Sequence, residues 1–395
     1  MIPHSRPSLG EEEKKAVLKV LDSLQLAQGP RTAEFEKKFC ALTGRKYAVA
    51  VSSGTSALML ALAAMEIGKG DEVIVPSFAC SALLHAVHFL GARAVPADID
   101  PEDFNLDPAR VKTKIRRKTR AVIAAHSFGR VSRMKEIENL GIPVLEDATQ
   151  ALGASIGQKK AGAFGEAAIF SFYATKMSTT GEGGMVLTDS KRLAGILEDL
   201  RDYDKKETHR LRTNSKMTDL EAAMGLEQVC KLPEFIRRRR EIASRYRVLL
   251  KDFPLSCPVE DESRDHVYFR FVVRIQKSES WLKELRRRRI DAKRPIFKPL
   301  HRVLQISPKE FPETERAIKE ACSLPIFPSM TAEEWEQISS AFGMMAGRAC
   351  QRQLSEPSGL GPAEGGPDGE SAGGRMPPEQ TNRRCRRQAL PARRS

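Results

Sequence analysis

Between Lys46 and Asp189 the chain alternates short apolar runs with segments of helical pattern. Seven of these runs are predicted to be strands: YAVAVS, DEVIVPS, ARAVPADI, TRAVIAAH, IPVLEDA, AAIFSFY and GMVLTD. Continuously apolar strands that alternate with helices are typical of a largely parallel sheet with both faces covered by helices. We therefore expect an α/β fold built on a seven-stranded, mixed but mostly parallel sheet.

The other segments predict the domain organisation. Residues 1–244 are expected to form a large domain in which helical segments precede the sheet. Residues 245–346 mix strand and helix patterns, such as HVYFRFVVRI and WLKELRRRRI, which predicts a smaller C-terminal α+β domain. Residues 347–395 are rich in Gly, Pro, Arg and Glu and contain almost no large apolar side chains. Because such a segment cannot bury enough surface to offset chain entropy, it is predicted to be disordered.

Two amphipathic helices are predicted before the sheet, each with boundary signals. In SLGEEEKKAVLKVLDSL, Ser8 and Glu11 have the spacing of a capping box. In TAEFEKKFCALTG, Thr32 is a candidate N-cap and Gly44 is expected to end the helix.

Composition argues against several kinds of site. The seven cysteines are scattered and form no C-x-x-C pair, which favours reduced thiols over a disulfide framework or a zinc site. The longest uncharged stretch, residues 47–65, is divided by the polar SSGTS, so it is interpreted as a strand, a turn and a helix rather than a membrane span. No targeting segment is recognised, and the expected location is the cytoplasm.

The formal net charge of +14 would attract an anionic partner. Two runs of four arginines, 237–240 and 286–289, lie in helix-like segments. Neither run is interleaved with aromatic residues, as single-strand binders require for base stacking. The runs are interpreted as solvated helix faces, in which arginine stems cover apolar surface, and no nucleic-acid partner is expected.

Ligands of open α/β sheets bind beyond the carboxyl ends of the strands, where three stretches of this chain stand out. The first, SSGTSAL, begins at Ser52. Gly54 permits close backbone approach, and Thr55 and Ser56 offer hydroxyl groups at a helix start, where free N–H groups bind phosphate. No dinucleotide or P-loop fingerprint competes with this interpretation, although Ser-Gly-Thr alone is common in strand–turn–helix units.

The second stretch, VLEDATQA, ends a strand with Glu146, Asp147 and Gln150. A carboxylate at this position is a metal ligand, a general base, a helix cap or the partner of a protonated ring nitrogen, and the residues alone leave these choices open. No His/Asp cluster has the spacing of a metal site. His126 also follows a predicted strand and is interpreted as structural.

The third stretch, FSFYATK, places Lys176 between an apolar strand and a glycine-rich turn. In an enclosed, partly apolar site the ammonium form is disfavoured, so such a lysine can react as an amine and form a Schiff base. The alternative is a surface lysine in a loop. A phosphate-binding turn, an acid and a Schiff-base lysine together are what pyridoxal 5′-phosphate requires. Their order, with Lys176 following Asp147 by 29 residues, fits a type I aminotransferase domain.

As an ordered set, the motifs of this chain resemble those of the DegT/DnrJ/EryC1/StrS family of pyridoxal phosphate-dependent sugar aminotransferases. The resemblance covers about residues 3–342 and rests on GPRTAEFEKKF, AVAVSSGTSALMLAL, GDEVIVPSF, VLEDATQALGA, FSFYATKMSTTGEGGMV, NSKMTDLEAAMGLEQ and SLPIFPSMT. It implies the type I fold of pyridoxal phosphate-dependent transferases. It also implies a ping-pong transamination that converts a nucleotide-linked keto-sugar to an amino sugar, with glutamate as the amino donor.

The resemblance implies a role for each site residue. Lys176 forms the Schiff base and then acts as the catalytic general base, Asp147 bonds the pyridine nitrogen, and Gln150 lies near the phenolic oxygen. The phosphate is held by Gly54, Thr55, Ser56 and Ser171. In NSKM, Asn214 or Lys216 contacts the phosphate in a neighbouring subunit, which implies a homodimer with shared active sites.

One departure from the family concerns the residue that stacks on the cofactor ring. Relatives often have an aromatic residue shortly after the PS of VIVPSF, and the matching position here is Cys80. Stacking then falls to Phe78 or to smaller groups. The basic stretch at residues 291–302 is compatible with a diphosphate ligand or with a solvated loop.

Two alternative functions remain. Some relatives are sugar dehydratases in which histidine replaces the Schiff-base lysine, and Lys176 argues against that activity here. A catalytically inactive protein that binds nucleic acid through its arginine runs is opposed by the intact set of lysine, aspartate and Ser-Gly-Thr turn.

Overall fold

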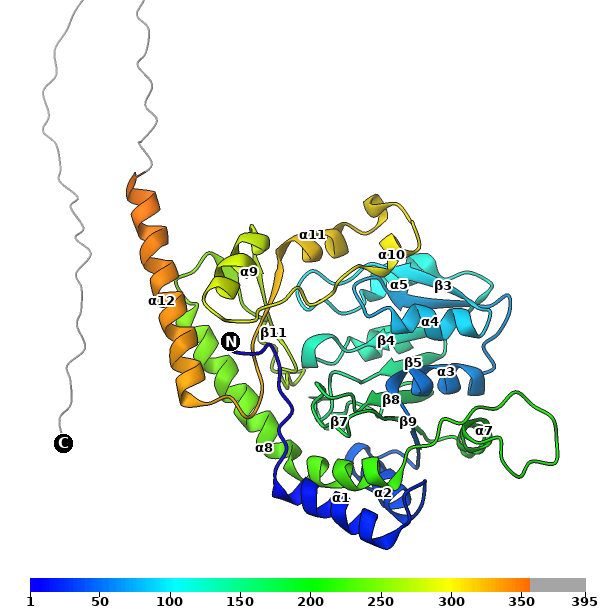
Figure 1. Ribbon diagram of the computed structural model, residues 1–395. Coiled ribbons are helices and arrows are strands. Elements are labelled where there is room, and N and C mark those ends of the chain that lie inside the picture. Colours follow the sequence, from blue (N-terminus) through cyan, green and yellow to red (C-terminus); the bar gives the residue numbers. More distant parts are fainter. Residues whose placement is uncertain (356–395) are drawn as a thin grey trace, which may run out of the picture. The chain divides into compact units, whose positions relative to one another are not determined.

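The computed structural model describes residues 1–355, with side chains up to Ala346 (Figure 1). Met1–Arg348 form one compact unit. The last helix, α12 (Ala332–Ser355), continues through residues 347–355, so the prediction of disorder is wrong for this start of the tail; residues 356–395 lie outside the described residues. No helix in residues 1–355 is long and apolar enough to cross a membrane.

All seven predicted strands form, and they build one sheet. Across the sheet the order is β1 (Tyr47–Val51), β9 (Gly184–Thr188), β8 (Ala167–Ser171), β5 (Val144–Asp147), β4 (Thr119–Ala125), β2 (Glu72–Pro76) and β3 (Arg93–Ala97). Only β9 runs against its neighbours, because it pairs antiparallel with both β1 and β8. The prediction of a mixed, mostly parallel sheet is therefore confirmed.

Helices cover both faces of this sheet, and alternate strand residues belong to different cores. One core takes Ile74 of β2 and lies under α2 (Pro30–Thr43), α5 (Pro108–Lys114), α6 (Met134–Glu138) and α8 (Asp219–Leu249). The other takes Val73 and Val75 and lies under α3 (Gly54–Ala64), α4 (Ala82–Phe89) and α7 (Lys191–Arg201). Successive side chains of a strand point to opposite faces, so both faces of each strand must be apolar.

A second, three-stranded antiparallel sheet has its own core. Its order is β10 (Leu255–Ser256), β11 (Phe271–Ile275) and β12 (Ala321–Leu324). The core includes Tyr246 of α8, Phe271 of β11 and Phe342 of α12. These three strands and α12 lie within or overlap residues 245–346, for which the sequence predicts a smaller α+β domain, and that division stays a prediction. Because α8 continues through residue 244 and supplies side chains to both cores, the boundary between 244 and 245 stays a prediction.

The remaining elements are a short hairpin, two 3₁₀ turns and three helices. They are the hairpin of β6 (Ser155–Ile156) and β7 (Lys159–Lys160), the 3₁₀ turns η1 (Ser127–Gly129) and η2 (Pro308–Glu310), and the helices α9 (Ser278–Arg287), α10 (Leu300–Val303) and α11 (Pro312–Glu320).

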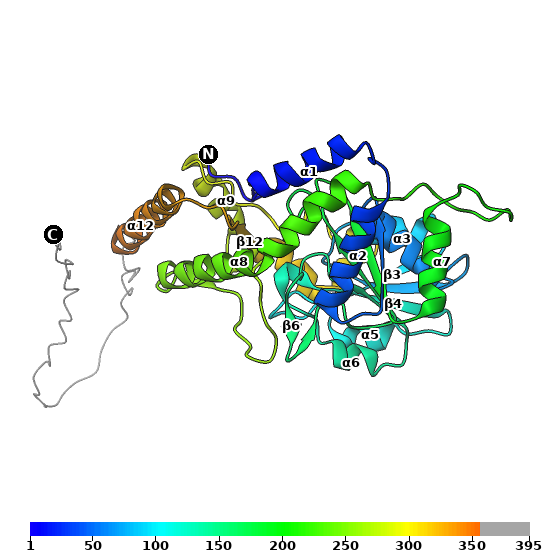
Figure 2. The same ribbon diagram turned by 90° about the horizontal axis from the view of Figure 1, so that it is seen from below.

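The helices before the sheet pack on α8, as Figure 2 shows for α1 (Glu11–Ser23) and α2. Gly44 ends α2 in the left-handed conformation (φ 81°), as predicted. The predicted N-caps are wrong. Helix α1 starts after Gly10, whose N–H donates to the side chain of Glu13. Helix α2 starts at Pro30, two residues before Thr32, and its N-cap is Gly29. A residue distant in sequence takes over the capping of α2.

That residue is Asp219 at the start of α8. Its buried carboxylate accepts hydrogen bonds from the backbone N–H groups of Gly29 (2.8 Å), Arg31 (3.1 Å) and Thr32 (2.9 Å), and from the Thr32 hydroxyl (2.7 Å). These donors have no partner within α2, because the first N–H groups of a helix have no carbonyl before them. Asp219 therefore fixes the start of α2 against the start of α8.

One arginine run also differs from its interpretation as a solvated face. Arg237 is exposed and pairs with Glu234. Arg239 instead is fully buried and donates to the backbone carbonyls of Phe269 (3.2 Å) and Ile326 (3.0 Å). The sequence pattern of the helix does not show that Arg239 is buried, because the carbonyl groups that accept its hydrogen bonds belong to residues distant in sequence.

Replacing Asp219 with alanine should lower the free energy of unfolding by at least about 2 kcal/mol, because it leaves buried N–H groups without an acceptor. Urea unfolding monitored by circular dichroism measures the change. The matched control is Glu34→Ala on α2, whose exposed carboxylate should be worth less than about 0.5 kcal/mol. Equal stability losses in the two variants would contradict the assignment of Asp219 as a buried cap.

Candidate active site

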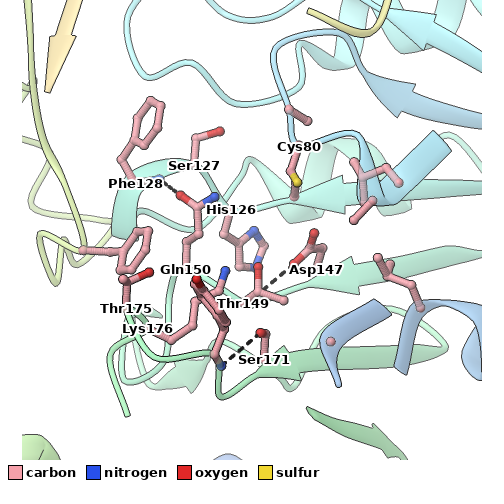
Figure 3. Close-up of a pocket in the computed structure, with 18 of the residues that line it drawn as sticks. Cys80, His126, Ser127, Phe128, Asp147, Thr149, Gln150, Ser171, Thr175 and Lys176 are labelled. Atoms are coloured by element: carbon pink, nitrogen blue, oxygen red, sulfur yellow. Dashed lines mark hydrogen bonds between the residues drawn. The ribbon is translucent and has the colours of Figure 1, made fainter. Parts of the chain in front are cut away.

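A cavity of about 480 Å³ lies at the carboxyl ends of β4, β5 and β8 (Figure 3). The parallel register brings these ends level, with Ala125 opposite Asp147 and Asp147 opposite Ile169. The sequence-predicted residues that line the cavity are Gly54, Thr55, Asp147, Gln150, Ser171 and Lys176. Ser56, Asn214 and Lys216 do not line it.

The start of α3 forms one end of the cavity. The side chain of Ser53 caps the helix by accepting a hydrogen bond from the N–H of Ser56 (3.0 Å). Gly54 lies so close to β8 that a Cβ there would be 2.6 Å from the Cβ of Ser171. The first-turn N–H groups of Gly54 and Thr55 have no partner within the helix, so this corner can bind an anion.

Ser56 lies at the same helix start but is directed elsewhere. Its hydroxyl group is hydrogen-bonded to the hydroxyl groups of Ser52 (3.1 Å) and Ser53 (2.9 Å). The structure thus brings Gly54, Thr55 and Ser171 to the cavity, whereas Ser56 lies outside the lining and is hydrogen-bonded within the turn.

Asp147 and Gln150 form the opposite part of the cavity, and both are oriented by hydrogen bonds (Figure 3). One carboxylate oxygen of Asp147 accepts from the N–H of Thr149 (3.1 Å). The amide oxygen of Gln150 accepts from the N–H of Phe128 (3.0 Å). Because its oxygen is engaged, the amide group of Gln150 has its NH₂ left to donate to a ligand.

Glu146 and His126 form a buried pair at the cavity, and His126 is part of its lining. The N–H of Ser132 donates to Nδ1 of His126 (3.2 Å), so the ring proton belongs on Nε2, which lies 2.8 Å from a carboxylate oxygen of Glu146. Both side chains are fully buried. Glu146 therefore supports the strand ends, while the carboxylate of the adjacent Asp147 lines the cavity.

Lys176 reaches the cavity from the loop after β8. Its backbone N–H donates to the carbonyl of Tyr173 (2.8 Å), and its Nζ lies 5.5 Å from the centroid of the Phe269 ring. Within residues 1–346 no hydrogen bond to Nζ is found. Desolvation lowers the pKa of the Lys176 ammonium, and the nearby charge of Asp147 opposes this effect. A larger fraction of this amine is therefore uncharged near neutral pH than for a surface lysine.

The NSKM stretch lies next to Ser52, which precedes the start of α3, and Asn214 and Lys216 lie outside the cavity lining. The N–H of Ser52 donates to the carbonyl of Ser215 (2.8 Å), and Lys216 forms an ion pair with Asp202 (2.9 Å). The preceding segment, 202–213, projects beyond α7 in both views of the fold (Figures 1 and 2).

Cys80 and Phe78, the two candidates left for the stacking position, both line the cavity. Phe78 is buried and packs against the rings of Phe104 (5.7 Å between centroids) and Phe128 (6.3 Å). The identity of the residue that stacks on the cofactor stays a prediction.

The cavity is also lined by residues to which the sequence analysis assigns no role, among them Phe128, Phe269 and Arg270. Arg270 and Phe269 enter from the segment before β11, far from the other site residues in sequence. From the basic stretch at 291–302 only Pro295 and Ile296 line the cavity. Two of its arginines are paired elsewhere, Arg294 with Glu279 and Arg302 with Glu315.

These residues fit pyridoxal 5′-phosphate. The group needs an anion-binding corner, a carboxylate for its pyridine nitrogen and an amine for its aldehyde. The cavity offers a corner that a Cβ at Gly54 would fill, a carboxylate with one oxygen not bonded to Thr149, and an amine with a lowered pKa.

Comparison with known proteins agrees with this fit. The chain matches the DegT/DnrJ/EryC1/StrS aminotransferase family over residues 7–343. It is 33% identical over 374 residues to the spore coat polysaccharide biosynthesis protein SpsC of Bacillus subtilis, covering 86% of this chain and 96% of SpsC.

Two solved structures are similar along most of the chain. The aminotransferase TlmJ from Streptoalloteichus hindustanus has a TM-score of 0.84 at 30% identity, covering 89% of this chain and 100% of TlmJ. DesV of S. venezuelae, solved with a ketimine intermediate, has a TM-score of 0.80 at 32% identity, covering 85% of this chain and 94% of DesV. The chain therefore belongs to the DegT/DnrJ/EryC1/StrS aminotransferase family, and it is a pyridoxal phosphate-dependent sugar aminotransferase.

Proposed function

We propose that this enzyme transfers the amino group of glutamate to a nucleotide-linked keto-sugar and so makes an amino sugar. The observation that carries the proposal is the lysine amine of Lys176. It is desolvated, has a lowered pKa and shares one cavity with Asp147 and the start of α3. A dehydratase of the same family would have histidine at this position.

Each cavity residue has a proposed task toward the cofactor. Lys176 attaches it covalently by condensing with its aldehyde, which releases water. Asp147 pairs with the pyridine nitrogen, and the NH₂ of Gln150 donates to the phenolic oxygen. Gly54, Thr55 and Ser171 bind the phosphate, and Ser56 holds their turn in shape. When bound, the cofactor supplies an electron sink for the substrate carbon.

Lys176 has a second proposed task once the amino donor displaces it. The free amine lies in the same cavity as the substrate, and its lowered pKa leaves it able to accept a proton at neutral pH. Lys176 then moves that proton between the substrate carbon and the cofactor carbon as a general base.

The sugar substrate is proposed from the relatives and from the cavity. SpsC is named for spore coat polysaccharide biosynthesis, and Helicobacter pylori PseC, with a TM-score of 0.80 at 27% identity over 87% of this chain, for the biosynthesis of pseudoaminic acid. We propose that the product here also serves a polysaccharide or another surface glycan. The exposed Lys298 and Phe297 follow the cavity-lining Pro295 and Ile296, and suit a nucleotide at the entrance.

We further propose a homodimer with shared active sites. Asn214 and Lys216 lie outside the cavity of their own chain, next to its phosphate-binding corner. The projecting segment before them exposes two large apolar side chains, Tyr203 (62% exposed) and Leu211 (78% exposed). Burial of such side chains against a second subunit is favourable, and it would bring Asn214 and Lys216 close to the partner's cofactor.

Lys176→Ala should abolish covalent attachment of the cofactor and slow amino transfer by at least about 100-fold, because the general base is lost. Borohydride reduction of the wild type, followed by peptide mass spectrometry, should locate the cofactor on Lys176. Amino transfer is measured by incubating the enzyme with glutamate and a panel of nucleotide-linked keto-sugars and detecting the amino-sugar products by mass spectrometry. A label on another lysine, or full activity of the variant, would refute the assignment.

Gly54→Ala should weaken cofactor binding by at least about tenfold, since a Cβ at this position occupies the phosphate-binding corner against Ser171. The dissociation constant is obtained by titrating the cofactor-free protein and recording absorbance. Gly195→Ala is the control, because a Cβ there meets no atom within 4 Å. Unchanged affinity in Gly54→Ala would place the phosphate elsewhere.

Mixing two inactive variants should restore activity if the sites are shared. One variant is Lys176→Ala, and the other replaces both Asn214 and Lys216 with alanine. After random exchange of subunits, half of the dimers are mixed and each carries one intact site, so about a quarter of wild-type activity is expected. Dimer formation is checked by native mass spectrometry, and no recovery in confirmed mixed dimers would contradict sharing.

A further inference from the structure

Arg270 is a charged cavity residue to which the proposed cofactor roles assign no task. It lines the same cavity as Lys176. Its guanidinium carbon lies 4.5 Å from the centroid of the Phe269 ring, and the Nζ of Lys176 lies 5.5 Å from the same centroid. Both cations therefore contact one aromatic ring at the same wall of the cavity.

The guanidinium of Arg270 lacks an anionic partner in the described part of the chain. Its Nη1 is buried and makes no hydrogen bond, and no carboxylate forms an ion pair with it. Its neighbour Arg239, also buried, adds a like charge rather than an opposite one. Burial lowers the pKa of Arg270 to about 10, which still leaves it positively charged at neutral pH.

A buried, unpaired cation is costly unless something compensates it. The carboxylates that line the cavity are Asp147, which is oriented by Thr149, and Glu182. Neither pairs with Arg270. An anionic ligand would supply the missing charge, and a planar guanidinium matches a carboxylate through two parallel hydrogen bonds.

Three anions enter the proposed reaction, and their chemistry distinguishes them. The cofactor phosphate has its corner at Gly54 and Ser171, on the large sheet. The diphosphate of a nucleotide-linked sugar is separated from the reacting keto group by the sugar ring. Only the amino donor carries a carboxylate on the same carbon as its reacting nitrogen, and that nitrogen must replace the amine of Lys176. Arg270 shares the Phe269 ring with this amine.

We propose that Arg270 binds the carboxylate of the amino-acid donor and so determines the donor side of the reaction. This inference rests on the proposed transamination. The arginine acts on the donor half-reaction alone, because the keto-sugar has no carboxylate at the corresponding position.

The test separates the two half-reactions of Arg270→Leu. Reaction of the holoenzyme with glutamate is followed by cofactor absorbance, and reaction of the pyridoxamine phosphate form with a nucleotide-linked keto-sugar is followed by mass spectrometry. In Arg270→Leu, kcat/KM for glutamate should fall by at least about 100-fold, whereas the keto-sugar half-reaction should change by less than about threefold. Arg270→Lys, which keeps the charge but loses the planar fork, should lie between.

Arg274 on β11, four residues after Arg270, provides a control. Its guanidinium is buried over the ring of Phe104 (4.2 Å) and forms an ion pair with Glu320 (3.6 Å), and it does not line the cavity. Arg274→Leu should leave both half-reactions within about threefold of wild type when its fold is intact by circular dichroism. An equal loss in Arg274→Leu and Arg270→Leu would show a general effect of removing a buried arginine and would overturn the proposal.

Calorimetric titration of the holoenzyme with glutarate gives a readout that does not depend on turnover. Glutarate should bind the wild type and bind Arg270→Leu at least about 30-fold more weakly. Equal glutarate affinity, or loss of the keto-sugar half-reaction alone, would overturn the role of Arg270. If the wild type transfers no amino group to any keto-sugar, the proposed function fails, and the titration still decides whether Arg270 binds a carboxylate.

Discussion

The buried carboxylate of Glu146 holds the strand ends on which the active site is built. It bonds to Nε2 of His126 at the end of β4, and it accepts hydrogen bonds from the backbone N–H groups of Gly162 (2.7 Å) and Phe164 (2.7 Å) in the loop before β8. A carboxylate without solvent is stable only when its oxygens are satisfied in this way. With Glu146 fixed below, Asp147 presents its carboxylate to the cavity at the level of β4 and β8.

The cavity itself departs from the rule that buried polar groups are paired. In the described residues, Nη1 of Arg270 is buried without a hydrogen-bond partner. Phe128 adopts a left-handed backbone conformation (φ 60°) while its N–H orients Gln150. Unfavourable conformations of this kind persist where the surrounding structure keeps the residue in place. Here the packed rings of Phe78, Phe104 and Phe128 keep Phe128 in place.

Backbone contacts between distant segments close the cavity. The N–H of Val267 donates to the carbonyl of Gly129 (2.9 Å), and the N–H of Arg270 donates to the carbonyl of Phe128 (3.2 Å). Gly129 has φ 107°, and a Cβ there would lie 2.7 Å from the backbone nitrogen of Phe269. The close approach at Gly129 thus brings the segment before β11 to the wall that Lys176 shares.

The sequence by itself determined the sheet, the cofactor class and the residues that meet at the strand ends. Apolar periodicity and turn residues are local signals, and the parallel register then places Asp147 and Ser171 at one edge without further information. Only the tertiary structure decided that Asp219 caps α2, that Ser56 lies outside the cavity lining, that Arg239 is buried and that Arg270 lines the same cavity as Lys176. Each of these depends on contacts between residues far apart along the chain, and a local sequence pattern does not identify the distant residue in such a contact.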